Sequence, residues 1–113
     1  MKIWQEGMSL VKITYRIVKS FPDIEKYNLT TQSIRCAVSI PSNIAEGTSK
    51  RTDRHFGQFL DTSLGSAFEW ETQMIVAHQE EYINEQQFLE LEKKIQDLQR
   101  MISGFIDGLD KKS

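Results

Sequence analysis

The residues of this chain that are able to do chemistry are few, and their spacing does not assemble a metal site. A di-iron site in a helical bundle needs Glu-x-x-His pairs, in which a carboxylate and an imidazole project inward from one helical turn. Thr52 and Ile75 stand three residues before the two histidines, His55 and His78, so neither pair is present. His78 and Glu81 have a metal-like spacing, but two ligands do not complete a site. We therefore expect no bound metal and no cofactor.

The candidate nucleophiles and acid–base residues are equally isolated. Cys36 stands in an apolar stretch and is expected to be a small buried side chain rather than an activated thiolate. Ser66 follows Gly65 within a predicted helix, without the strand–turn–helix context of a nucleophile elbow. Glu69 and Glu71 are two residues apart on that helix, so their side chains diverge by about 200° and cannot act as a paired acid and base. The sequence thus predicts no catalytic residues and a protein that is not an enzyme.

One segment combines proline, polar and small residues within an apolar helix, since residues 39–47 read Ser-Ile-Pro-Ser-Asn-Ile-Ala-Glu-Gly. Pro41 has no amide hydrogen for the carbonyl of Ala37, so we expect the helix to be kinked or broken there. Asn43 can satisfy a freed backbone group, and Glu46 can meet a donor or a basic partner. A structural polar network is favoured over a binding site, and both interpretations stay open. The residues assigned to this network are Ser39, Pro41, Ser42, Asn43, Glu46 and Gly47.

Four stretches with helical periodicity must position these residues, and no strand is predicted. They span about 2–20, 30–47, 52–79 and 84–109. Connections of about nine, five and four residues make consecutive helices antiparallel neighbours. The sequence therefore predicts an all-α, up-down-up-down four-helix bundle that forms a single domain over residues 1–113.

The ends of these helices carry capping signals. Thr30 and Thr52 are expected to cap the N-termini of the second and third helices, and Gly47 to cap the C-terminus of the second. Asn84 and Gln87 have the spacing of a capping box at the start of the fourth helix.

Each predicted helix has an apolar face. In the first helix this face is expected to comprise Trp4, Met8, Val11, Tyr15 and Val18, with Ile3, Leu10 and Ile17 beside it. In the fourth helix it comprises Phe88, Leu91, Ile95, Leu98, Ile102, Phe105 and Leu109. The third helix has one face of Phe56, Leu60, Ser63, Ala67, Trp70, Met74 and Ala77, and a second, displaced stripe of Leu64, Phe68 and Ile75. A helix that is apolar on two sides is either central to a core or shared with a second subunit.

The near-neutral total charge of −2 hides an asymmetry between the two halves of the chain. Residues 1–56 hold nine Lys/Arg against five Asp/Glu, whereas residues 57–113 hold five against eleven. Basic patches can neutralise phosphates and steer a polyanion. Simple solvation, or pairing with acids on a neighbouring helix, is the competing interpretation. The candidate nucleic-acid-binding residues are Lys12, Arg16, Lys19, Arg35, Lys50, Arg51 and Arg54.

Composition argues against a disordered, membrane-spanning or secreted protein. The chain has 113 residues, of which 39% are apolar, enough for one core. No apolar run approaches the roughly 20 residues of a membrane span, and residues 1–6 lack the apolar core of a signal peptide. A lone Cys36 cannot form an internal disulfide. We expect a cytoplasmic protein that does not associate with a membrane.

Residues 39–47 resemble the motif of the small four-helix-bundle proteins encoded by intervening sequences in bacterial 23S rRNA genes. The resemblance extends to Trp4-Gln5, to Phe21-Pro22, and to the run Glu69-Trp70-Glu71-Thr72-Gln73-Met74, which is similar to the family's Glu-Leu-Glu-Thr-Gln-Leu. It adds Glu69 and Glu71 to the motif residues. Glu81 stands where the family usually has the glycine of Gly-Tyr-Ile.

The family resemblance implies an oligomer, because relatives form ring-like homopentamers. The similar accessory protein of diversity-generating retroelements binds nucleic acid and a reverse transcriptase, so the resemblance implies RNA, DNA or such a protein as a partner. Leu64, Phe68 and Ile75 are the candidate subunit interface. We therefore expect a non-enzymatic oligomeric scaffold for structured RNA or DNA; the alternative is a protein–protein interaction module that binds no nucleic acid.

Overall fold

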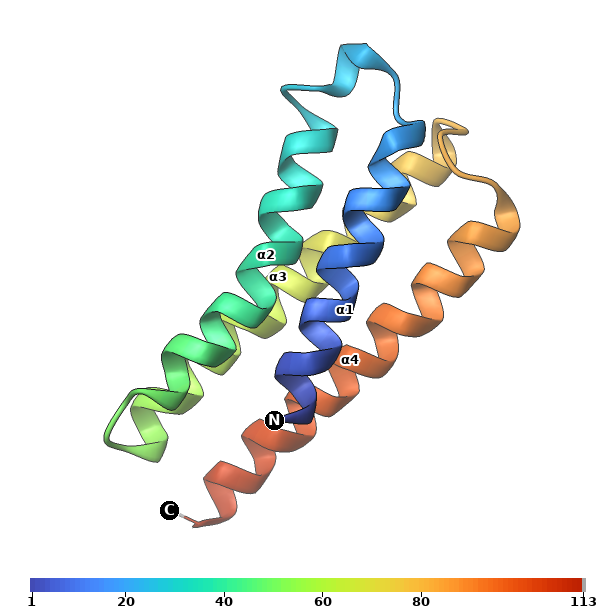
Figure 1. Ribbon diagram of the computed structural model, residues 1–113. Coiled ribbons are helices and arrows are strands. Elements are labelled where there is room, and N and C mark those ends of the chain that lie inside the picture. The colour runs from blue at the N-terminus through green and yellow to red at the C-terminus, as the bar shows by residue number, and fades with distance from the viewer. Residues whose placement is uncertain (113) are drawn as a thin grey trace.

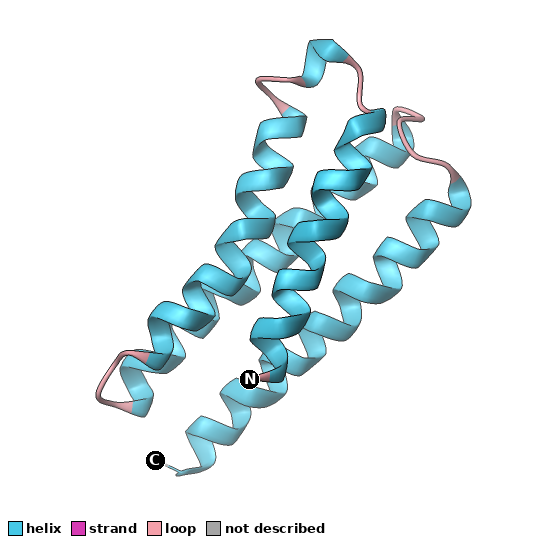
Figure 2. Cartoon of the chain, viewed as in Figure 1, coloured by secondary structure: helices cyan, strands magenta, loops and turns pink. Residues whose placement is uncertain are grey.

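The computed structural model describes residues 1–112 and contains four long helices within them. These are α1 (Lys2–Ile17), α2 (Leu29–Thr48), α3 (Asp53–Gln79) and α4 (Glu85–Lys112), with short 3₁₀ turns η1 (Val18–Ser20) and η2 (Asp23–Glu25). Figure 1 shows the helices running alternately up and down along a body of 46 × 25 × 18 Å. The ribbon of the described residues carries no strand (Figure 2), so the predicted all-α four-helix bundle is confirmed.

The helices are packed in the order of the sequence. α1 contacts α2 and α4, and α3 also contacts α2 and α4. The α1–α2 edge of the bundle is therefore opposite the α3–α4 edge, and the α2–α3 edge is opposite the α1–α4 edge (Figure 1). None of the helices in the described chain combines the length and apolarity that crossing a bilayer would need.

Trp70 of α3 lies at the centre of the core and is fully buried. Its indole Nε1 donates a hydrogen bond of 3.0 Å to Thr14 Oγ1 of α1, and that hydroxyl donates in turn to the carbonyl of Leu10 at 2.7 Å. Burying an indole N–H without an acceptor would be unfavourable. Thr14 is therefore the residue that allows the largest core side chain to face α1.

The predicted face of the first helix is confirmed only in part. Ile3, Leu10 and Val18 are buried as expected, whereas Trp4, Met8 and Tyr15 are exposed. The buried face also includes Gly7 and Thr14, which a count of large apolar residues misses because the reasons for their burial lie on other helices.

Gly7 is one such residue, since it allows α1 to approach α2 closely. A Cβ at Gly7 would lie 3.3 Å from the Cβ of Pro41, which is buried in α2. α2 itself continues through Pro41 without interruption from Leu29 to Thr48. The helix is thus not broken at this proline, whose ring instead packs against the bare backbone of the neighbouring helix.

Both predicted caps of α2 are wrong. The helix begins at Leu29, so Asn28 and not Thr30 is the N-cap residue. Gly47 lies inside the helix without a positive φ, because α2 extends to Thr48. A Cβ at Gly47 would lie 2.7 Å from Cδ1 of Phe56, so this glycine serves the contact between α2 and α3.

The caps of α3 and α4 are confirmed. Thr52 Oγ1 accepts a hydrogen bond of 3.1 Å from the backbone N–H of His55. The side chains of Asn84 and Gln87 each accept a hydrogen bond of 2.8 Å from the backbone N–H of the other residue, which is the reciprocal pattern of a capping box.

The predicted core faces of α3 and α4 are also confirmed. In α3, Leu60, Ser63, Ala67, Trp70, Met74 and Ala77 are buried, with Phe56 half-buried. In α4, Leu91, Ile95, Leu98, Ile102 and Leu109 are buried, and Phe88 and Phe105 are half-buried. Both patterns are continuous at helical spacing, which is why sequence periodicity located them correctly.

Candidate functional site

A polar network joins α2 to α3 on one edge of the bundle. Ser39 Oγ lies 2.8 Å from Ser66 Oγ, and the Asn43 side-chain amide donates to the carbonyl of Ser39 at 2.8 Å and to its hydroxyl at 3.0 Å. Deeper in the interface, the buried hydroxyl of Ser63 donates to the carbonyl of Ile40 at 2.9 Å. Small hydroxyl side chains let the helices approach, and each finds a partner on the other helix. The predicted structural network therefore exists, and Ser39 and Asn43 belong to it.

Cys36 extends this network toward Glu69. Its Sγ lies 2.9 Å from Glu69 Oε2 and 3.0 Å from the carbonyl of Ser66. Burial, followed by the hydrogen bond to Glu69, raises the pKa of the Cys36 thiol far above its ordinary value. The residue remains a protonated, inert thiol. The prediction of a small buried side chain is confirmed, but its role as a hydrogen-bond donor to Glu69 was missed.

The other residues assigned to the motif do not join the network. Ser42 and Glu46 are exposed, and Pro41 and Gly47 are buried contacts to α1 and α3. Glu71 points away from α2 and contacts α4 instead, where its Oε1 accepts a hydrogen bond of 2.9 Å from Gln99. The predicted divergence of Glu69 and Glu71 is thus observed.

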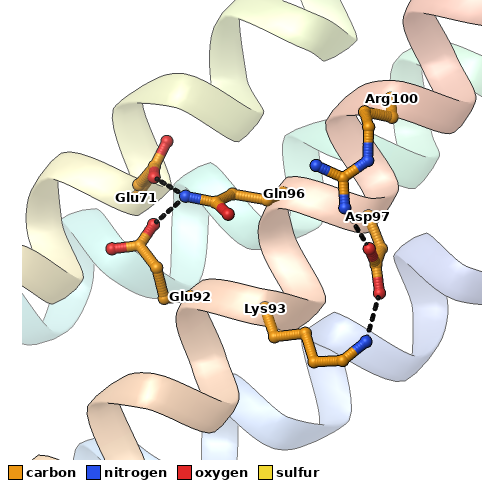
Figure 3. Close-up of polar contacts among 6 residues, drawn as sticks. All are labelled: Glu71, Glu92, Lys93, Gln96, Asp97 and Arg100. Carbon is orange, nitrogen blue, oxygen red and sulfur yellow. Dashed lines mark hydrogen bonds and ion pairs between the residues drawn. The ribbon is translucent and has the colours of Figure 1, made fainter.

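Glu71 meets a second carboxyl group, that of Glu92 on α4. Figure 3 shows Gln96 between the two, with its Nε2 at 3.4 Å from Glu71 Oε2 and 3.2 Å from Glu92 Oε1. Hydrogen bonding to Glu92 lowers the pKa of Glu71. Burial, together with the hydrogen bond to Glu71, raises the pKa of Glu92 to about 7. The pair therefore takes up a proton from solvent as the pH falls through about 7.

The surroundings of this carboxyl pair on α4 are charged side chains that pair with one another. The described residues include no group of three His, Cys, Asp or Glu side chains arranged to hold a metal ion. The charged neighbours on α4 are Lys93, Asp97 and Arg100, and they pair with one another: Asp97 accepts from Arg100 and, at 3.4 Å, from Lys93 (Figure 3). The two glutamates are 21 residues apart on different helices, so no local pattern identifies them.

His78 lies at the end of α3, as predicted, and its contacts come from α4. Its ring stacks on Phe88 with 4.3 Å between centroids, and its Nε2 lies 3.1 Å from Glu85 Oε2. The acid beside it is therefore Glu85 and not Glu81, the residue with the metal-like spacing.

The candidate nucleic-acid-binding residues lie in separate places. Lys12, Arg16 and Lys19 are exposed along α1 and η1, whereas residues 50–54 surround the α2–α3 turn at the opposite end of the bundle (Figure 1). Arg35 is exposed on α2, in a third place. Lys50 lies over the Phe59 ring, 4.9 Å from its centroid. Within residues 1–112, none of the seven cations forms an ion pair with an acidic side chain.

Two apolar surfaces lie on opposite edges of the bundle. The first, the α3–α4 surface, is formed by Leu64, Phe68 and Ile75; Phe68 is 52% exposed, and it borders a groove of about 420 Å³ between the two helices. The second, the α1–α2 surface, is formed by Met1, Trp4, Met8 and Ala45. Met1, Trp4 and Ala45 line an open hollow of about 220 Å³.

The chain is similar to known proteins in both sequence and fold. The model of the family described as 23S rRNA-intervening sequence protein matches residues 1–104. A crystal structure of a protein with unknown function from the S23 ribosomal protein family of Bacteroides thetaiotaomicron superposes with a TM-score of 0.84 at 19% identity, covering 92% of this chain and 97% of that one. No curated protein gives a significant match. The family match spans nearly the whole bundle, and the chain belongs to the 23S rRNA-intervening sequence protein family.

Proposed function

We propose that the protein is a non-enzymatic scaffold that assembles from several copies and presents basic residues to structured RNA or DNA. Assembly occurs when the α1–α2 surface of one copy docks on the α3–α4 surface of the next. The ring of five copies that the family resemblance implies is the closed form of this arrangement.

The observation that supports assembly is the position of the two apolar surfaces. They share no residue and lie on opposite edges of the bundle. A surface that docks on a different surface of an identical copy makes a head-to-tail contact, and repeated head-to-tail contacts close into a ring when the rotation allows it. Two unlike surfaces on one small domain thus favour a ring over a two-fold dimer.

Nucleic-acid binding is supported by the cations that have no acidic partner. Lys12 and Arg16 are exposed one turn apart on α1 and form no ion pair among the described residues. A ring repeats such a pair once per copy, so modest local charge becomes an extended basic band. Phosphate contacts of this type orient a nucleic acid without reading its sequence, and their affinity falls steeply with salt.

The test of nucleic-acid binding is filter retention of a structured RNA across a range of salt concentrations. Replacing Lys12 and Arg16 by glutamate should weaken binding and reduce the slope of log affinity against log salt by about 2. The matched control replaces Lys93 and Lys111, two cations of α4, by glutamate and should keep the slope. The mass of each assembly is measured in the same samples by light scattering.

Each outcome has a distinct meaning. A reduced slope with intact assembly supports the proposal. No retention of RNA or DNA by the unaltered protein at low salt contradicts it and leaves a protein–protein interaction module, the alternative that the apolar surfaces also favour.

A further inference from the structure

The groove beside Phe68 on the α3–α4 surface also reaches a carboxyl group. Glu71 lines this groove of about 420 Å³ together with the side-chain amides of Gln96 and Gln99. Glu71 is half-buried, and so is Glu92, its neighbour across the contact between the two helices. A second copy that covers the groove therefore covers a carboxyl pair, and the ionisation of that pair becomes part of the contact.

The two carboxyl groups are held on either side of one amide. Gln96 Nε2 lies 3.4 Å from Glu71 Oε2 and 3.2 Å from Glu92 Oε1 (Figure 3). Gln99 donates a further hydrogen bond of 2.9 Å to Glu71 Oε1. No cation among the described residues forms an ion pair with either glutamate. Two carboxylates held together by neutral amides favour one shared proton, because repulsion between like charges penalises double ionisation.

The other charged or titratable side chains that flank the pair have partners of their own. On α4, Asp97 accepts from Lys93 and Arg100. From α1, Glu6 reaches α4 but pairs with Lys94 at 3.6 Å. The flanking side chains on α3 and α4 are Glu69, His78, Glu85, Lys93, Asp97 and Arg100. None of them forms an ion pair with the two glutamates, so the pair keeps its own charge.

The α1–α2 surface of a second copy is the occupant of the groove that the charge distribution favours. Residues 1–56, which contain α1 and α2, hold nine Lys/Arg against five Asp/Glu, whereas residues 57–113, which contain α4 and most of α3, hold five against eleven. Opposite net charges steer the α1–α2 edge of one copy toward the α3–α4 edge of another. The side chains that form the α1–α2 surface, those of Met1, Trp4, Met8 and Ala45, are uncharged. They displace water from the groove without supplying a counter-charge.

We propose that docking of the next copy draws a proton from solvent onto the Glu71–Glu92 pair, so that assembly is strong in mild acid and weakens as the pH rises. The apolar surface removes water that solvates the carboxylates, and like charges repel more strongly in a less polar environment. One proton removes this penalty and lets a carboxylic O–H donate to the remaining carboxylate. This inference rests on the proposed assembly and names a regulation of it.

The sign and size of the pH dependence follow from proton linkage. Burial, together with the hydrogen bond to Glu71, already raises the pKa of Glu92 to about 7 in the single copy. Between this pKa and the higher pKa of the docked pair, the docked state binds more protons than the free state. The association constant per contact should therefore fall by up to about tenfold per pH unit above pH 7. Below about pH 6 both states are protonated, and the association constant should level off.

The test is sedimentation of the full chain over a dilution series, at constant ionic strength, from about pH 5.5 to about pH 8.5. Circular dichroism at each pH verifies that the copies stay folded. Glu92→Gln keeps an amide in place of the carboxyl group but removes one charge. This variant should assemble throughout the range as strongly as the parent does at its acid end.

Two controls isolate the carboxyl pair. Glu90→Gln neutralises an exposed neighbour on α4 and should keep the parent's pH dependence. Histidine is the other residue type that titrates in this range, so the second control replaces both His55 and His78 by glutamine. It should also keep the parent's pH dependence.

The outcomes separate this proposal from the scaffold proposal. If the parent assembles equally strongly across the range, or if Glu92→Gln keeps the parent's pH dependence, the proton link is overturned and the scaffold stands. Assembly that strengthens as the pH rises would mean that a cation beside the α1–α2 surface, Lys12 or the amino group of Met1, pairs with the carboxylates, and it would also overturn the link. A parent that stays monomeric at every pH would overturn both proposals.

Discussion

Glu81 occupies the left-handed backbone region, with a φ of 62°. It follows the end of α3, where the N–H of Tyr82 bonds to the carbonyl of Ala77 and that of Glu81 bonds to His78. This is the Schellman pattern, in which glycine is the usual residue at the position of Glu81. Glutamate is strained there because its Cβ crowds the backbone.

Replacing Glu81 by glycine should therefore stabilise the fold by about 1 kcal/mol, since glycine adopts this conformation without strain. Urea unfolding at a fixed protein concentration measures the change. Glu80→Gly is the matched control: its φ of −84° suits any residue, so the substitution should be neutral or destabilising. A Glu81→Gly variant less stable than the parent would show that the turn depends on the glutamate side chain.

Glu92 gives the stability of the bundle a pH dependence. Its pKa is raised from 4.5 to about 7 in the folded protein, so its contribution is present below pH 4.5 and is lost as the pH rises through about 7. The lowered pKa of Glu71 acts in the opposite sense, and its contribution is lost as the pH falls below 4.5. Between pH 4.5 and about 7, the raised pKa of Glu92 therefore sets how the stability changes with pH.

Glu92→Gln should remove the loss of stability between roughly pH 5 and pH 8. At the upper end of this range its free energy of unfolding should exceed that of the parent by about 1 kcal/mol, a value that already allows for solvent screening of this half-buried pair. Thermal or urea unfolding across this range measures it. Glu90→Gln, an exposed neighbour on α4, should keep the parent's slope. An unchanged slope in Glu92→Gln would assign the pH dependence to other groups.

At the level of helix packing, the close contact between α2 and α3 depends on the absence of a side chain at Gly47. An alanine Cβ there would lie 2.7 Å from Cδ1 of Phe56 and 3.0 Å from Cβ of Phe59. Gly47→Ala should cost about 1–3 kcal/mol from overpacking, partly offset by better helix propensity. A Cβ added at Gly104 of α4 would meet no neighbouring atom within 4 Å, so Gly104→Ala should instead stabilise by up to about 1 kcal/mol. If Gly47→Ala and Gly104→Ala changed the free energy of unfolding in urea by the same amount, the close α2–α3 contact at Gly47 would be contradicted.

Helix positions and the core faces of α3 and α4 could be predicted because the information is local. The capping box of Asn84 and Gln87 needs only four residues of sequence, and helical periodicity identifies the buried side of α4. The face of α1 could be predicted only in part in this way, because Gly7 and Thr14 carry no apolar signal. Thr14 is buried because Trp70 donates to it, and Gly7 because Pro41 packs on it, and both partners are distant in sequence.

The candidate site shows the same contrast between features within one helix and contacts between two helices. Ser39 and Asn43, one turn apart on α2, were predicted to form a polar network because their spacing is local. The hydrogen bond of Cys36 to Glu69 and the pairing of Glu71 with Glu92 both arise where two helices meet. Such features depend on the register between helices, which residue spacing within one helix does not contain.

At the scale of the whole molecule, the bundle is asymmetric: one edge presents Trp4 and Met8, and the opposite edge presents Phe68 and Ile75. This asymmetry is the feature that favours head-to-tail assembly. Two variants each remove one surface: Trp4→Glu with Met8→Glu, and Phe68→Glu with Ile75→Glu. All four residues are exposed in the single chain, so both variants should fold, as circular dichroism would verify.

The most direct measurement is native mass spectrometry of the two variants, first separately and then mixed. Each variant alone retains one half of the interface and should be a monomer. The equimolar mixture should form a complex of one copy of each variant, because the intact α1–α2 surface of one meets the intact α3–α4 surface of the other, and it should grow no further. Assembly of either variant alone to the size of the parent, or a mixture that stays monomeric, would rule out head-to-tail assembly through these two surfaces.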